Sequence, residues 1–86
     1  MSNHSRGYYS LFLRQIEEAE LDPAVAQFAA GCIARGIPVA AVAEWMGVTR
    51  VTVYNWFTGK TTPRAAQLAR IQKAAVRFPR IRIPHD

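Results

Sequence analysis

The chain has 86 residues, is half hydrophobic and carries a formal net charge of +5. These values exclude a disordered chain and indicate a single domain, residues 1–86, with one modest core at about residues 8–78. The single cysteine, Cys32, excludes an internal disulfide and leaves too few thiolates for a zinc finger, so we expect it in the core. No stretch approaches the roughly 18–20 apolar residues of a membrane span, and the N-terminus has no apolar signal-peptide run. We therefore expect a reducing, cytoplasmic location and no membrane partner.

The charge is unevenly distributed along the chain. Residues 1–48 hold three basic and five acidic residues, a net of −2, whereas residues 49–86 hold eight basic residues and one acid, a net of +7. Because each Lys or Arg beside a phosphate releases a condensed counterion, a basic half of this kind favours a polyanionic partner. A solvated basic surface explains the same charge equally well, so charge alone leaves both interpretations open.

Apolar residues recur at helical spacing along the chain, which predicts an all-α fold. Asp22-Pro23 and Thr62-Pro63 each place an N-cap before a proline in the first turn, and Thr49 is a further N-cap. Gly36 and Gly47 supply C-caps. Together these signals predict a compact bundle of five helices, at about residues 8–20, 22–35, 38–47, 49–58 and 62–78.

The first predicted helix and the tail leave alternatives open. That helix has more apolar surface than one edge of a small bundle requires, so the surface either covers the core or forms a dimer interface. It consists of Tyr8, Tyr9, Leu11, Phe12 and Leu13. In the basic tail, residues 79–86, Pro79 and Pro84 prevent a helix, and the alternation at 80–83 fits either a short edge strand or a disordered arm.

The fifth predicted helix has two different faces. Its apolar residues, which we expect to be buried, are Leu68, Ile71, Ala75 and Phe78. Its opposite face carries the cations Arg70, Lys73 and Arg77. That face is either a solvated charged surface or a contact for DNA or an acidic protein.

Residues 39–58 have the pattern of two short helices that meet at a sharp angle. Such a pair needs a small residue where the backbones approach, a turn residue that tolerates a positive φ, and apolar residues that lock the helices together. Ala43 supplies the small contact and Gly47 supplies the turn. The apolar lock consists of Val42, Met46, Val48, Val53 and Trp56.

The second of these short helices is predicted to have an apolar back and an exposed front. At a step of ~100° per residue, Trp56 and Phe57 lie on the same side as Val53, so we expect Trp56 in the core. The front carries a cation, an amide, a phenol and small groups, from Arg50, Val51, Tyr54, Asn55 and Thr58. Such a front suits the major groove of DNA, where Arg bonds the O6/N7 edge of guanine, Asn bonds the N6/N7 edge of adenine, and Val packs on a thymine methyl.

A series of residues at fixed offsets runs through and beyond this segment: Ala43, Gly47-Val48-Thr49, Val53, Trp56, Gly59-Lys60 and Pro63. With this pattern the segment resembles the helix-turn-helix of the Cro and phage-repressor family, also called the xenobiotic-response-element type. The resemblance covers about residues 25–75. It implies a lambda-repressor-like fold, double-stranded DNA as the partner, and a homodimer on near-palindromic half-sites about one helical turn, ~34 Å, apart.

The resemblance also implies roles for the matching positions. The base-reading residues are Arg50, Val51 and Asn55, with Tyr54 beside them. The expected phosphate contacts are Thr49, Thr58, Lys60, Thr61, Thr62 and Arg64, to which the exposed face of the fifth helix adds Arg70. The chain departs from the family at Val39, where Gln is common, and at Thr58, where Asn or another polar residue is common.

The basic half and the resemblance together predict a sequence-specific DNA-binding transcriptional regulator. A compact domain of this type resembles repressors of phages or mobile elements, which act in the cytoplasm or nucleoid of a bacterial host. One alternative is a protein-binding inhibitor or adaptor that contacts RNA polymerase or a nuclease, because fold does not fix function. Another is a small terminase subunit or a recombination accessory factor.

An enzyme is not expected. His4 and His85 lie at the two ends of the chain, where side chains are positioned least precisely. Glu17, Glu18, Glu20 and Asp22 cluster without a base or metal partner nearby in the sequence, and no glycine-rich phosphate loop or catalytic triad is present. We therefore expect no catalytic residue, no metal and no cofactor.

Overall fold

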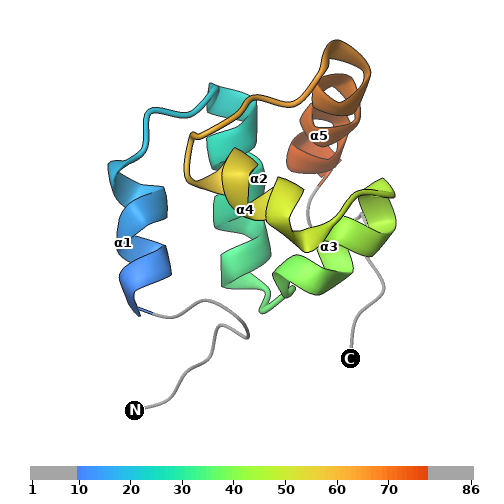
Figure 1. Cartoon of the computed structure of the whole chain (residues 1–86). Coiled ribbons are helices and arrows are strands. Elements are labelled where there is room, and N and C mark those ends of the chain that lie inside the picture. The colour runs from blue at the N-terminus through green and yellow to red at the C-terminus, as the bar shows by residue number, and fades with distance from the viewer. Residues whose placement is uncertain (1–9, 78–86) are drawn as a thin grey trace.

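The computed structural model describes residues 10–77, and this part of the chain is all-helical (Figure 1). Its helices are α1 (Ser10–Glu18), α2 (Pro23–Ala34), α3 (Val39–Met46), α4 (Arg50–Phe57) and α5 (Ala65–Arg77). The predicted all-α fold, with five helices in this order, is confirmed for these residues. The predicted tail at 79–86 and the side chains of Tyr8, Tyr9 and Phe78 lie outside the described residues.

Two predicted N-caps form the hydrogen bonds that begin their helices. The Asp22 carboxylate accepts a hydrogen bond from the backbone N–H of Ala24 at 2.8 Å, ahead of α2. The Thr49 hydroxyl accepts one from the backbone N–H of Thr52 at 3.2 Å, ahead of α4. Each bond satisfies one backbone donor that a helix N-terminus would otherwise leave free.

The predicted start of the last helix is wrong by two residues. α5 begins at Ala65, not at Pro63. The backbone N–H of Arg64 donates to Oε1 of Gln67 at 2.9 Å, and the Arg64 carbonyl accepts from the N–H of Leu68 at 2.8 Å. Arg64 therefore takes the N-cap position and Gln67 completes half of a capping box. Pro63 is buried in the loop before them.

Helices α2, α3 and α4 end in the same arrangement. Gly36, Gly47 and Gly59 follow them with φ of 65°, 73° and 81°. The residue after each glycine donates its N–H to the carbonyl five residues earlier at 2.9 Å: Ile37 to Cys32, Val48 to Ala43 and Lys60 to Asn55. Only glycine adopts this left-handed conformation without strain, and the resulting bond closes the helix and reverses the chain.

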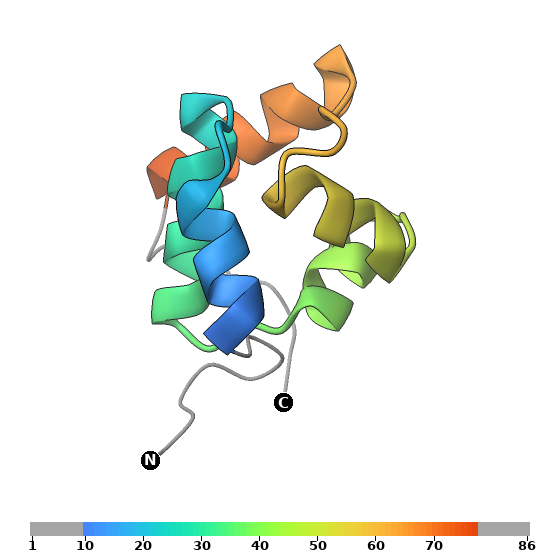
Figure 2. The ribbon, with the colours of Figure 1, turned by 60° about the vertical axis from the view of Figure 1, so that its left-hand side comes forward.

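The core lies around α2. This helix packs against α4 and α5, and α3 packs against α4. Figures 1 and 2 show α1 beside α2, on the opposite side from α5. All five helices contribute buried apolar side chains, among them Phe12, Phe28, Val42, Val53, Phe57 and Ile71. The helix-turn-helix segment is thus fixed from behind by a single continuous core.

Cys32 is fully buried among the core residues, as predicted. Burial raises the pKa of its thiol to about 12, because the thiolate would lose its hydration; the positive charge of Arg35 opposes the shift only in part. The thiol is therefore protonated at neutral pH and acts as a small apolar side chain.

The apolar surface of α1 is only partly used by the core. Phe12 is buried, and Leu13 and Ile16 are half-buried against the core, whereas Leu11 is 66% exposed. Covering the core therefore accounts for Phe12 and Leu13 but leaves Leu11 unexplained.

Candidate nucleic-acid interface

The turn between α3 and α4 has the features that the sequence predicts. Gly47 has a φ of 73°, and Ala43 is buried where the two helices pack together. Four of the five predicted locking residues are buried, and Val48 is half-buried against them. These contacts hold α4 by its apolar back, so its N-terminal turn is supported while its front stays accessible.

The N-terminal turn of α4 presents its side chains to solvent. Thr49 and Arg50 are exposed, and Val51 is 65% exposed although it is apolar. The Thr49 hydroxyl also lies 3.0 Å from the hydroxyl of Thr52. Asn55, one turn further along, is half-buried. A guanidinium, an exposed isopropyl group and an amide therefore follow one another along the front of the helix.

Tyr54 is only partly exposed on α4, because α1 packs against its ring. Its ring centre is 4.8 Å from that of Phe12 in α1, at an interplanar angle of 59°, and the residue is half-buried against the core. Tyr54 lies about 100° from Val53 around α4, which is the flank that α1 covers. The periodicity of α4 alone carries no signal of that contact.

The Thr58 side chain makes a hydrogen bond within the fold. Its hydroxyl donates to the carbonyl of Tyr54 at 2.7 Å and is partly buried. The same carbonyl also accepts a hydrogen bond from the backbone N–H of Thr58 at 3.0 Å, so the hydroxyl adds a second bond at the end of α4. The hydroxyl proton is therefore already used by α4.

The loop after α4 carries the remaining predicted phosphate contacts. Lys60, Thr61, Thr62 and Arg64 are all exposed. The backbone N–H groups of Lys60 and Thr61 donate to the Asn55 carbonyl at 2.9 and 3.3 Å, which ties the loop to the end of α4. The structure thus keeps Lys60 close to the front of α4.

The same loop lies against the connection between α1 and α2. A Cβ atom at Gly59 would lie 3.4 Å from the Cβ of Ala19 and 3.6 Å from Cδ2 of Leu21. Glu20 and Asp22, on that connection, line a small hollow together with Thr61 and Thr62. Two acidic residues therefore border the threonine side of the loop, which the sequence alone did not predict.

Arg70 of α5 contacts an aromatic ring. Its guanidinium carbon lies 4.6 Å from the centre of the Trp45 ring in α3. Trp45 is half-buried and stacks on Phe28, with ring centres 5.9 Å apart. Lys73 and Arg77 are exposed on the same helix, as predicted. The contact joins residues 25 positions apart in the sequence, so helical periodicity could not predict it.

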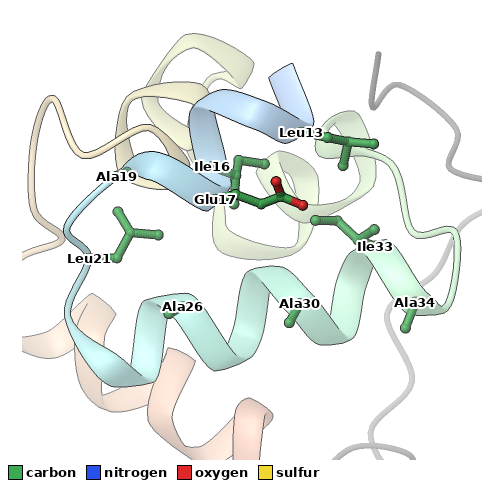
Figure 3. Close-up of a pocket in the computed structure, with 9 residues that line it drawn as sticks. All are labelled: Leu13, Ile16, Glu17, Ala19, Leu21, Ala26, Ala30, Ile33 and Ala34. Carbon is green, nitrogen blue, oxygen red and sulfur yellow. The ribbon is translucent and has the colours of Figure 1, made fainter. Parts of the chain in front are cut away.

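A groove of about 650 Å³ runs between α1 and α2 (Figure 3). Side chains of Leu13 and Ile16 from α1 and of Ile33 from α2 border it, and Glu17 is its one charged lining residue. The floor on α2 is formed by alanines four residues apart, Ala26, Ala30 and Ala34. The sequence alone does not predict this groove, because its two walls come from separate helices.

Within residues 10–77, no cluster of His, Cys, Asp and Glu side chains could hold a metal ion. None of the helices in this part of the chain has the length and apolar character needed to cross a membrane. Comparison with protein-family models, with curated proteins and with solved structures found no match.

Proposed function

We propose that the protein is a sequence-specific double-stranded DNA-binding transcriptional regulator that inserts α4 into the major groove. The observation that carries the proposal is the N-terminal turn of α4. There Arg50 and Val51 are exposed on a helix whose opposite face is buried. Exposing an isopropyl group beside a guanidinium has no packing benefit, whereas both groups fit the edges of base pairs.

In this proposal Arg50 bonds a guanine edge, Asn55 bonds an adenine edge, and Val51 packs on a thymine methyl. Tyr54 supports α4 through Phe12 and does not read bases directly. Thr49 caps α4, and the backbone N–H groups of its first turn face a phosphate.

The phosphate backbone passes over Lys60 and Arg64. These cations are exposed at the two ends of the loop between α4 and α5. Glu20 and Asp22 border Thr61 and Thr62, so their charges disfavour a phosphate on that side of the loop. Arg70 extends the basic surface along α5.

The resemblance to the Cro and phage-repressor family supports a repressor encoded by a phage or mobile element. It also supports a homodimer that binds near-palindromic half-sites about one helical turn, ~34 Å, apart. Such a dimer would present two copies of α4 to one side of the duplex.

Selection of bound sequences from a random duplex pool at physiological salt tests the proposal. An enriched near-palindrome is the expected result. If the protein retains duplexes without enriching any sequence, the regulator proposal is wrong and a packaging or recombination accessory role is favoured. No retention would reject DNA binding and leave the protein-binding alternative, an inhibitor or adaptor of polymerase or a nuclease.

A further inference from the structure

The Trp45–Arg70 pair joins α3 and α5 at the molecular surface. The 4.6 Å separation lies within the range of a cation–π interaction. Arg70 is exposed, and its guanidinium has no hydrogen bond or ion pair with any residue in the described part of the chain. Its N–H groups therefore remain available to an external acceptor.

Trp45 is itself held in place by the core. It stacks on Phe28 of α2 at an interplanar angle of 26°, and Phe28 makes an edge contact with Phe57 of α4, with ring centres 6.3 Å apart. Phe28 and Phe57 are completely buried. The ring under Arg70 is thus a fixed platform that connects α5 to the helix-turn-helix.

The charge of α5 favours an external anion. Residues 65–77 include Arg70, Lys73 and Arg77 and no Asp or Glu. Like charges three and four residues apart destabilise a helix, so an uncompensated row of them is costly unless an anion binds. Arg64 precedes Arg70 by six residues, which is about 9 Å along a helix axis, so the row begins at the proposed phosphate-binding loop.

We infer that Trp45 is a positioning residue that holds the Arg70 guanidinium ready to bind a DNA phosphate. The inference rests on the proposed function. Stacking on a ring face leaves the N–H groups at the edge of the guanidinium plane free to donate. Because the side chain is already ordered, phosphate binding costs less conformational entropy than it would for a free arginine.

Affinity for a short mixed-sequence duplex, measured across a range of salt concentrations, tests this inference. Arg70→Gln removes a charge, so the slope of log K against log salt should fall by about one. Trp45→Leu keeps the charge, so the slope should stay the same while affinity falls about two- to fivefold. The double variant should bind no more weakly than Arg70→Gln alone, and Trp45→Phe should recover part of the affinity.

Lys73→Gln is the matched control, because Lys73 is an exposed cation on the same helix. The fold loss of affinity caused by Lys73→Gln should multiply with the fold loss caused by Trp45→Leu, because the two residues act independently. Arg70→Gln should also change the tryptophan emission of the free protein, whereas Lys73→Gln should not. Trp45→Phe serves as the test variant if Trp45→Leu does not fold.

The outcomes separate the inference from the proposed function. If the unaltered protein does not bind the duplex at low salt, the proposed function is wrong. If it binds, but the effects of Trp45→Leu and Arg70→Gln simply multiply, only the inference is overturned. An unchanged salt slope in Arg70→Gln would likewise overturn it while leaving DNA binding intact.

Discussion

Arg50 and Tyr54 lie one turn apart on α4 but have different environments. Arg50 is exposed at the first position of the helix, while the ring of Tyr54 packs on Phe12 of α1. Because of this difference in packing, the Arg50 side chain is accessible to a partner, whereas the Tyr54 ring supports α4.

Substitution of each residue tests this division. Arg50→Ala should weaken specific binding by about 1–3 kcal/mol and relax specificity at one base pair, because a two-bond contact with guanine is lost. Tyr54→Phe keeps the packed ring and should leave the selected sequence unchanged. Repeated selection from a random duplex pool measures both effects. If Tyr54→Phe selects a different DNA sequence, Tyr54 reads bases directly.

The buried thiol of Cys32 allows a second prediction at this scale. Its pKa is raised from 9.0 to about 12 in the folded chain, so folding favours the protonated form. The associated stability is fully present below pH 9 and is lost as pH rises from about 9 towards 12. A thiol reagent should therefore leave Cys32 unmodified in the native protein at pH 8 and modify it in denaturant, as measured by mass spectrometry. Rapid native labelling would show that the site opens readily.

At the scale of the elements, the turn between α3 and α4 depends on one backbone conformation. Gly47 has a φ of 73°, and a Cβ atom placed there would meet no atom within 4 Å outside its immediate neighbours. A substitution would therefore be opposed by backbone strain and not by a steric clash.

Gly47→Ala should lower the free energy of unfolding by about 1–2 kcal/mol, because an L side chain is strained in the left-handed region. For a domain of this size the melting temperature should fall by roughly 5–10 °C. Gly47→Asn should cost less, since Asn tolerates this conformation, and Gly47→Val should cost more. Thermal denaturation of the three variants provides the measurement, and an equal loss for Ala and Asn would contradict the strain argument.

Helical periodicity and caps predict the number and order of the helices because these signals are local. The start of α5 was misplaced because Gln67 binds the N–H of Arg64 and so moves the cap beyond Pro63. Within the candidate interface, the exposure of Arg50 and Val51 was predicted correctly. The contacts Tyr54–Phe12 and Arg70–Trp45 were not, since each depends on how two separate helices pack.

Across residues 10–77, most acidic and most basic side chains occupy different elements, with Arg14 on α1 and Glu44 on α3 as exceptions. The acids Glu17, Glu18, Glu20 and Asp22 lie on α1 and the connection to α2, whereas α4, α5 and the loop between them contain only basic charged residues. The two groups meet at the loop after α4, where Glu20 and Asp22 border Thr61 and Thr62. In the proposed complex, this boundary limits the surface that a phosphate backbone can follow.

Lys60→Ala should weaken binding to all duplexes about equally and reduce the salt slope by about one, because a phosphate contact carries no sequence information. Arg14→Ala, which removes an exposed cation from α1, is the control and should leave the slope unchanged. Fluorescence anisotropy titrations at several salt concentrations provide the measurement. Equal slopes for the Lys60 variant and the unaltered protein would remove Lys60 from the interface.

The shortness of α4 limits how much sequence information one copy can read. Eight residues span about 12 Å, which matches the rise of three to four base pairs. A four-base-pair word recurs by chance about every 250 base pairs, whereas a bacterial genome offers on the order of a million or more competing positions. Two copies on a palindrome would read about eight base pairs. The average spacing between chance matches would then be the square of the value for one copy. Under the proposed function, an eight-residue recognition helix therefore reads too little sequence as a single copy to find one operator.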